Sequence, residues 1–135
     1  MSEPFLNQYL KFVDAVTSEP SRDKEAFLAR IGELYDQGCD VARLHTAADG
    51  LVAEGGEFME IVKKITFQGK PFNDDNVFHM KRELGDVMWY FAQACMALRL
   101  DPYEIIEENI RKLEARYPGG HFEISRSEIR KAGDL

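Results

Sequence analysis

VARLHTAADGLVAEGGEFMEIVKKITF (residues 41–67) is the stretch that decides the fold, because its apolar residues recur every three or four positions and no proline interrupts them. This spacing is typical of an amphipathic α-helix, whereas apolar residues alternate in a strand. The stretch also carries two features that helix stability does not require. Gly55 and Gly56 stand side by side in its middle, where each costs about 1 kcal/mol relative to alanine, and three glutamates stand among its apolar residues.

Helical spacing continues along the rest of the chain, and no segment shows the alternation of a strand. The run TSEPS (17–21) predicts a turn, and Gly38 is placed to end a helix. Capping residues begin the later helices: Asn73 or Asp74 for one, and Asp101 followed by Pro102 for the last. We therefore expect an all-α bundle of about five helices in a single domain (1–135), with helices near residues 5–16, 27–35, 41–67, 74–98 and 102–116 and a polar tail over 118–135.

Composition narrows the class of protein. A chain of 135 residues with 44% hydrophobic residues is long enough for one globular domain. The net charge of −7 argues against binding to nucleic acid or to a membrane surface, which both require an excess of Lys and Arg. Cys39 and Cys95 have no metal-binding or disulfide spacing. With no apolar run near ~18 residues and no signal-like N-terminus, a cytoplasmic location is expected.

Helical geometry predicts where the acids of residues 41–67 point, at about 100° per residue. Glu54 falls about 80° from the centre of the apolar face, inside its arc. Glu57 falls at the edge of that arc, and Glu60 falls on the far side beside Lys63 and Lys64. The centre of the face is defined by Leu44, Ala48, Leu51, Phe58 and Val62.

The next helix repeats this arrangement in RELGDVMWYF (82–91). Glu83 falls about 100° from the expected core line of Leu84, Phe91, Cys95 and Leu98, and Asp86 lies beside it. Both helices thus place two carboxylates three residues apart at the border of the core, with Gly55, Gly56 and Gly85 beside them. These small residues would let backbones approach and leave room for a ligand.

Four carboxylates converging between two helices would repel one another without a cation. An all-oxygen set favours Mg²⁺, with Mn²⁺ able to substitute. A di-iron bundle would need Glu-x-x-His pairs, and His45, His79 and His121 are not so placed. On the last helix, Asn109, Lys112 and Arg116 form a polar stripe that could complement polyphosphate oxygens. Further candidates on weaker grounds are Lys63, Lys64 and Lys70.

These residues resemble the MazG-like, all-α nucleoside triphosphate pyrophosphohydrolases, relatives of the dimeric dUTPases. Their mark is Glu-x-x-Glu, a gap, then Glu-x-x-Asp; here it reads EGGE, 25 residues (58–82) and ELGD. GLVAEGGEFMEIVKK, RELGDVMWYFAQA and EENIRKLEARYPGG look like the small single-domain forms of bacteriophages, cyanophages among them. The resemblance covers residues 41–122. One position departs: many members have a further Glu before the first acid of the motif, where this chain has Ala53.

The resemblance implies that Glu54, Glu57, Glu83 and Asp86 bind Mg²⁺ and that the enzyme converts a (d)NTP to a (d)NMP and pyrophosphate. Either Glu54 or Glu57 would be the general base for the attacking water. Asn109, Lys112 and Arg116 match a family stripe that faces the phosphates or the sugar. Tyr117 could border the nucleotide or, equally, have a structural role at the helix end. A homodimer, or a homotetramer built from two dimers, is implied, in the host cytoplasm if a phage encodes the chain.

Base recognition has several candidates, each of which is more often part of the core or of a subunit interface: His45, Leu51, Phe67, Trp89 and Tyr90. Trp89 lies off the expected core line, which favours burial against another subunit. Two alternatives to NTP hydrolysis stay open. One is hydrolysis of another pyrophosphate-bearing nucleotide, such as ppGpp or a damaged-base triphosphate. The other is a non-catalytic helical module that senses a nucleotide or a metal.

Overall fold

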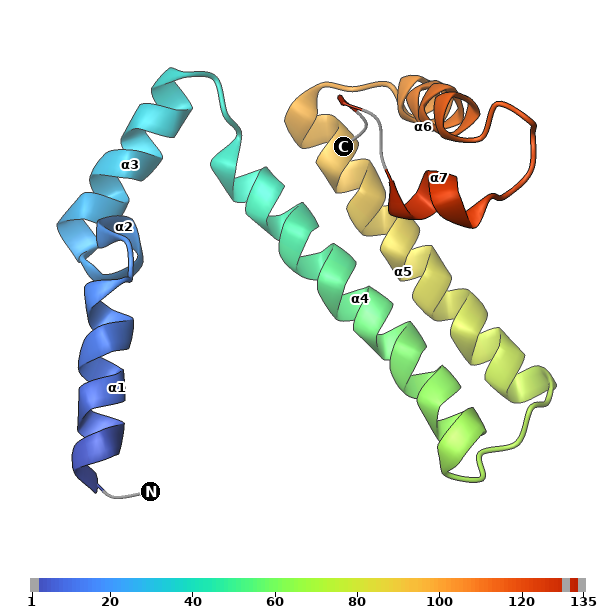
Figure 1. The fold of residues 1–135 in the computed structure, drawn as a ribbon, viewed down its shortest axis with the longest axis horizontal. Helices are drawn as coiled ribbons and strands as arrows, with labels where there is room; N and C mark the ends of the chain where they lie inside the picture. Colours follow the sequence, from blue (N-terminus) through green and yellow to red (C-terminus); the bar gives the residue numbers. More distant parts are fainter. Residues whose placement is uncertain (1–2, 130–131, 134–135) are drawn as a thin grey trace. The chain divides into compact units, whose positions relative to one another are not determined.

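A computed structural model describes residues 3–129 and 132–133, and it divides into two compact units between Ala42 and Arg43. Over these residues the chain forms seven α-helices and no strand (Figure 1). Five of the helices have 13 or more residues. The all-α prediction and the prediction of about five main helices are therefore confirmed. The assignment of a single domain stays a prediction.

The first unit contains α1 (Glu3–Ala15), α2 (Glu19–Arg22) and α3 (Lys24–Asp36). Part of the predicted turn at 17–21 is instead the short helix α2. Its physical reason is Pro20, which lies in the first turn, where a helix does not need the missing N–H. Arg22 then joins the end of α1 to α2 through ion pairs with Asp14 (3.0 Å) and Glu19.

Helix α3 begins at a cap that the apolar spacing did not reveal and ends at Gly38 as predicted. The Asp23 carboxylate accepts a hydrogen bond from the Ala26 N–H (2.8 Å), which caps the first turn. At the other end Gly38 has a φ of +82°, a conformation that favours glycine. The Gly38 N–H donates to the Tyr35 carbonyl (3.0 Å) and the Cys39 N–H to the Leu34 carbonyl (2.9 Å), which closes the helix.

The second unit is built around two long helices, α4 (Val41–Phe67) and α5 (Asp74–Leu98), which lie antiparallel (Figure 1). The bounds of α4 agree with the prediction, and Asn73 caps α5 by accepting from the Asn76 N–H (3.0 Å). Helix α6 (Pro102–Arg116) follows, with the Asp101 carboxylate accepting from the Tyr103 N–H (2.9 Å). A short helix that the sequence analysis missed, α7 (Ile124–Glu128), lies in the polar tail.

The surfaces by which α4 and α5 face each other differ from the predicted apolar faces. Along α4 the inward line runs at seven-residue spacing through the buried Ala47, the half-buried Glu54 and the buried Ile61. Ala48 and Val62, expected at the centre, are exposed. The helix is apolar on more than one side, so the centre of its whole apolar stripe does not coincide with the part that contacts α5.

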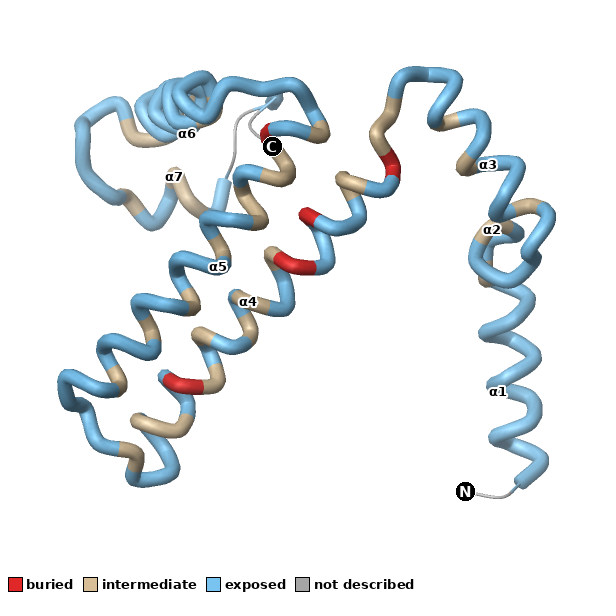
Figure 2. Tube along the Cα trace, turned by 180° about the vertical axis from the view of Figure 1, so that it is seen from behind, coloured by how far each residue is buried: buried red, intermediate tan, exposed pale blue. Residues whose placement is uncertain are grey.

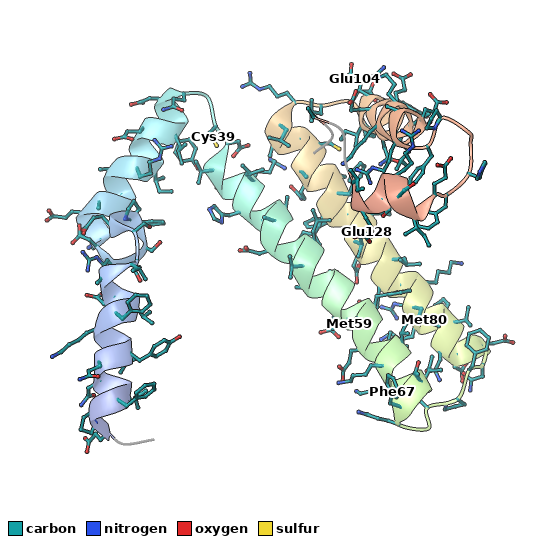
Figure 3. All side chains as sticks on the ribbon, in the orientation of Figure 1. Cys39, Met59, Phe67, Met80, Glu104 and Glu128 are labelled. Carbon is teal, nitrogen blue, oxygen red and sulfur yellow. The ribbon has the colours of Figure 1, made fainter. Side chains whose placement is uncertain are left out.

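The inward face of helix α5 also differs from its expected apolar face, and the offset is in the same direction as on α4. Its partly buried line runs through Met80 (Figure 3), Glu83, Val87, Tyr90 and Ala94. Of the expected core line, Leu84 and Leu98 are exposed, whereas Cys95 is buried and Phe91 half-buried. On both helices the inward face is therefore centred nearer to a glutamate than the apolar pattern predicts.

Buried side chains are few, as Figure 2 shows. Among the described residues the buried apolar side chains are Val41, Ala47, Ile61 and Cys95. Large apolar side chains are exposed on both long helices, among them Met59 and Phe67 of α4 (Figure 3). The apolar stripe of α1 is exposed in the same way. No described helix is both long enough and apolar enough to cross a membrane.

Candidate metal centre

Three acids from the two long helices come together between them. One carboxylate oxygen of each of Glu54, Glu83 and Asp86 lies within 4.8 Å of the others, and we call this set the carboxylate cluster. Glu54 and Glu83 are half-buried and Asp86 is exposed. Glu54 lies 29 or more positions before the other two acids in the chain, and they come together because α4 and α5 are antiparallel and meet at this level.

Glu54 and Glu83 contact each other directly. The Glu54 carboxyl group forms a side-chain hydrogen bond with Glu83. Burial raises the pKa of Glu54, and this hydrogen bond and the negative charges of Asp86, Glu83 and Glu57 raise it further. Two carboxylates in contact cannot both keep their charge at no cost, so this contact favours the protonated form of Glu54. A cation would supply the same compensation.

Glu57, the fourth acid of the predicted metal site, is exposed and lies outside the carboxylate cluster. Its charge still contributes to the raised pKa of Glu54, as the weakest of the named causes. Glu57 therefore borders the cluster without sharing its oxygens, and its metal-binding role stays a prediction.

Glu60 has different surroundings on the same helix. Its carboxylate oxygens lie 3.0 Å from Lys63 Nζ and 3.2 Å from Lys64 Nζ. Hydrogen bonds to these two lysines, followed by their charges, lower the pKa of Glu60. This arrangement agrees with the far-side placement predicted from the helical wheel. It also engages Lys63, a predicted substrate contact, in an ion pair within α4.

The glycines beside the acids do not bring backbones together. A Cβ atom added to Gly55, Gly56 or Gly85 would meet nothing within 4 Å, so the expectation of close backbone approach there is wrong. The expectation of open space beside the acids is met. The close approach lies instead at Gly50, where a Cβ would overlap the ring of Tyr90. Gly50 was missed because the sequence does not show which α5 side chain lies opposite.

The predicted phosphate contacts lie on α6, which begins after the end of α5 away from the cluster. Asn109 is exposed, whereas Lys112 and Arg116 are half-buried. Lys112 makes no ion pair within the described part of the chain. Lys70 is half-buried after the end of α4. None of these residues belongs to the carboxylate cluster, and their substrate contacts stay predictions.

Tyr117 caps the end of α6 through its N–H, which donates to the Leu113 carbonyl (2.8 Å). Its ring packs on Phe122, with centroids 5.5 Å apart. Both rings line a shallow pocket of about 280 Å³ together with Leu113, Glu114, Gly120 and His121. The structural role weighed for Tyr117 at the helix end is thus observed.

The candidates for base recognition divide into packed and exposed side chains. Tyr90 is half-buried over Gly50, and Trp89 contacts it edge to face at 4.9 Å. Trp89 itself is 56% exposed, which agrees with its predicted position off the core line. Phe67 and His45 are exposed, and Leu51 is half-buried.

One neighbour of the carboxylate cluster was set aside in the sequence analysis. His79 lies one helical turn before Glu83, and its Nε2 atom is 3.2 Å from Glu83 Oε1. The histidines were tested only against the Glu-x-x-His spacing of di-iron bundles. The signal that could have found this pair is the spacing of four residues, which places two side chains on one face of a helix.

The donor set fits a hard divalent cation. It consists of carboxylate oxygens, without thiolate or imidazole atoms among the three converging groups, which is the chemistry that Mg²⁺ and Mn²⁺ prefer. The raised pKa of Glu54 and the open space at Gly55, Gly56 and Gly85 agree with such a site. The cluster could therefore hold a metal ion and leave space beside it for a ligand.

Comparisons with known proteins agree with this geometry. Gene 37 protein of Mycobacterium phage L5 is 36% identical over 84 residues, which cover 61% of this chain and 74% of that protein. No solved structure matches. The family model of the MazG nucleotide pyrophosphohydrolase domain matches residues 43–121, which include all of the carboxylate cluster and more than half of the chain. The chain belongs to the MazG nucleotide pyrophosphohydrolase family.

Proposed function

We propose that this protein hydrolyses nucleoside triphosphates, ribo or deoxy, to the monophosphate and pyrophosphate, and that it does so with Mg²⁺. The observation that carries the proposal is the convergence of Glu54, Glu83 and Asp86 from two antiparallel helices. Family membership supplies the reaction class, nucleotide pyrophosphate hydrolysis. The open space beside Gly55 and Gly56 supports room for a ligand next to these acids.

Glu54, Glu83 and Asp86 would hold the metal through their carboxylate oxygens. When bound, Mg²⁺ supplies positive charge that offsets the charge of the phosphates and helps to orient the groups that react. The charged form of Glu54 would then be favoured, because the cation compensates its negative charge.

The attacking water must lose a proton to a carboxylate that the metal does not occupy. Of the two candidates, Glu57 lies outside the carboxylate cluster and is exposed, whereas Glu54 is engaged with Glu83. We therefore assign the proton to a carboxylate oxygen of Glu57. Water oxygen bonds to the α-phosphorus in line, the bond to the bridging oxygen breaks, and pyrophosphate leaves with the electron pair of that bond.

The substrate would need further positive groups for oxygens that the cation does not reach. Asn109, Lys112 and Arg116 are the proposed contacts, and of these Lys112 is half-buried without an ion pair in the described residues. Tyr117 is a weaker candidate because its ring already packs on Phe122. Guanidinium and ammonium groups bind phosphate through charge-assisted hydrogen bonds.

We also propose that the chain assembles as a homodimer or a homotetramer. The support is the amount of apolar surface left uncovered on α4 and α5, where Val52 is 78% exposed and Met59, Met88 and Trp89 are also exposed. Isolated soluble chains rarely leave many large apolar side chains of their main helices uncovered. A second copy of the same helix pair would cover them. Sedimentation velocity tests this, and Trp89, the single tryptophan, reports dissociation by a red shift of its fluorescence.

The catalytic proposal is tested with purified protein, Mg²⁺ and a panel of eight common NTPs and dNTPs, with ppGpp and an oxidised-base triphosphate added. In ¹⁸O water, attack at the α-phosphorus places the label in the monophosphate. Release of orthophosphate and a diphosphate would contradict the proposed bond cleavage. Turnover only of ppGpp or only of the oxidised base would replace the substrate class. No turnover of any member, with Mn²⁺ bound, would favour the sensing module.

The matched variants are Glu57→Gln and Glu60→Gln, which make the same change three residues apart. Glu57→Gln removes the proposed proton acceptor, and we expect turnover to fall about 100-fold or more. Glu60→Gln breaks an exposed pair with Lys63 and Lys64, and we expect turnover within about twofold of the unmodified protein. Equal losses in the two variants would contradict the role of Glu57.

A further inference from the structure

His79 is the one basic side chain that contacts the carboxylate cluster within the described residues. Its Nε2 atom lies 3.2 Å from Glu83 Oε1, one helical turn away on α5. The two side chains differ in exposure: His79 is 53% exposed and Glu83 is 13% exposed. The pair therefore extends from the solvent-exposed ring of His79 to the less accessible carboxylate of Glu83.

Glu83 makes two polar side-chain contacts within the described part of the chain. One is with the carboxyl group of Glu54 and the other is with the ring of His79. A carboxylate oxygen accepts hydrogen bonds, so the contact between Nε2 and Oε1 is favourable when Nε2 of His79 carries a hydrogen. Each carboxylate has two oxygens with about four lone-pair directions. The contact at Oε1 thus restrains the side chain of Glu83 and leaves capacity for another partner.

We infer that His79 is a positioning residue, whose contact with Glu83 holds that carboxylate facing Glu54 and Asp86 in the orientation that binds a divalent cation. The inference rests on the proposed function, because it assigns His79 a role toward the metal centre proposed there. Groups that bond to metal ligands orient them, and their loss typically weakens metal binding. A restrained ligand also loses less rotamer freedom when the ion binds.

A contrasting pair shows what an ordinary surface contact looks like. Arg30 Nη1 lies 3.0 Å from Glu33 Oε2 on α3, and both side chains are about half exposed or more. Such a pair touches no candidate ligand, so breaking it should leave metal binding unchanged. The His79–Glu83 pair differs because its acid is largely buried and is bonded to a second acid. Arg30→Gln is therefore the matched control.

The experiment measures Mn²⁺ binding to the full chain without nucleotide, from the electron paramagnetic resonance signal of free Mn²⁺. The variants are His79→Leu, which removes the donor, and His79→Gln, which keeps an N–H donor without the ring. We expect His79→Leu to raise the dissociation constant for Mn²⁺ roughly tenfold. This is the low end of the range for groups that bond to metal ligands, because the ring of His79 is half exposed. His79→Gln should recover most of the affinity, and Arg30→Gln should bind like the unmodified protein.

A second readout separates positioning from loss of fold and from loss of catalysis. Circular dichroism should show unchanged helicity in all variants. In the nucleotide assay, His79→Leu should raise the Mg²⁺ concentration needed for half-maximal rate and leave kcat at saturating Mg²⁺ within about threefold. A residue that only supports helix stability would alter the melting temperature without moving the metal dependence.

The outcomes distinguish this inference from the proposed function. If the protein turns over nucleotides and His79→Leu binds Mn²⁺ with unchanged affinity, the inference is overturned and the function stands. Equal losses in His79→Leu and His79→Gln would also overturn it, because the donor would not be the cause. If Mn²⁺ binding weakens in His79→Leu alone but no nucleotide is hydrolysed, the inference stands and the function fails. If the unmodified protein binds no Mn²⁺, both fail.

Discussion

Two neighbouring stretches of α4 differ in whether the space beside their glycines is filled or open. At Gly50 the helix is buried and the ring of Tyr90 occupies the place where a Cβ would lie. One turn later, at Gly55 and Gly56, a Cβ would meet nothing within 4 Å. Both stretches use glycine inside a helix, at a cost of about 1 kcal/mol for each residue relative to alanine. In the first the cost is offset by packing, and in the second it is not.

The difference supports the proposal that the open stretch receives a ligand. Along the inward line of α4, Ala47 and Ile61 are buried, and the position midway between them is Glu54. An apolar residue at that position would have continued the packing on both sides. The charged form of a half-buried acid beside another acid is disfavoured, and a proton or a cation offsets that cost. Helices α4 and α5 thus pack against each other at the levels of Gly50 and Ile61. Between these two levels α4 carries the carboxylate oxygens of Glu54 instead of an apolar side chain.

The largest expected effect tests whether the open stretch is a metal centre. Replacing Glu54 by Gln removes one ligand and the negative charge that the cation offsets. We expect turnover to fall by at least about 100-fold and added Mg²⁺ to lose its stabilising effect on the melting temperature. Steady-state assays and thermal melts with Mg²⁺ or EDTA measure both. Glu60→Gln on the same helix is the control, and equal damage there would erase the distinction between the two acids.

The next effect tests the closed stretch. In Gly50→Ala the new methyl group must displace the ring of Tyr90, which also carries the contact with Trp89. Overpacking of this kind costs about 1–3 kcal/mol, more than the roughly 1 kcal/mol that alanine gains in a helix. We expect a lower free energy of unfolding in urea and a shift in Trp89 fluorescence. A double variant with Tyr90→Ala should recover part of the loss, and a lack of recovery would mean that the ring is not the cause.

A smaller effect of opposite sign is expected one turn away. In Gly55→Ala the methyl group enters open space, so the metal-free protein should gain about 1 kcal/mol of unfolding free energy from helix propensity. If that space receives the substrate, KM for the nucleotide should rise while the dissociation constant for Mn²⁺ stays unchanged. Urea titration, kinetics and Mn²⁺ binding check the three parts. A stabilised variant with unaltered KM would show that the space is not used by the nucleotide.

Local signals predicted the helices well. The bounds of α4 follow from uninterrupted helical spacing, and those of α5 and α6 from the caps Asn73 and Asp101, whose side chains bond to the first turn as expected. The short helices were less visible, because four or five residues give too little periodicity to detect. Pro20, interpreted as a turn residue, instead lies in the first turn of α2.

It was harder to predict which side of each long helix faces the other helix. It was also harder to predict which acids form the carboxylate cluster. An apolar stripe shows which side of α4 avoids water, but it does not divide that side between α5 and another surface. Val62 was therefore expected at the centre and is exposed, whereas Glu54 was expected at the border and lies on the inward line. The approach of Glu54 to Glu83 depends on how the two helices are aligned. The Gly50–Tyr90 contact contributes to that alignment, and it cannot be read from residue spacing.

The smallest effect is a pH dependence that separates Glu54 from Glu60 without metal. Folding raises the pKa of Glu54 above its ordinary value of 4.5, so the folded chain holds this proton more tightly than the unfolded chain. Its contribution to stability is therefore complete below 4.5 and declines as pH rises through the raised pKa. Folding lowers the pKa of Glu60, whose contribution is present above 4.5 and is lost as pH falls through the lowered value.

Thermal melts in EDTA from about pH 3 to about pH 8 should therefore change in opposite directions in two matched variants. Glu54→Gln keeps a donor for Glu83 and removes the charge, so its melting temperature should exceed that of the unmodified protein at neutral pH and approach it in acid. Glu60→Gln should lie about 2 °C or less below the unmodified protein at neutral pH, because its pairs with Lys63 and Lys64 are exposed, and should equal it in acid. Parallel curves for the two variants would mean that the inward and outward acids of α4 have equivalent surroundings. The carboxylate cluster would then need no cation to be stable, and the contrast between the two stretches of α4 would lose its electrostatic basis.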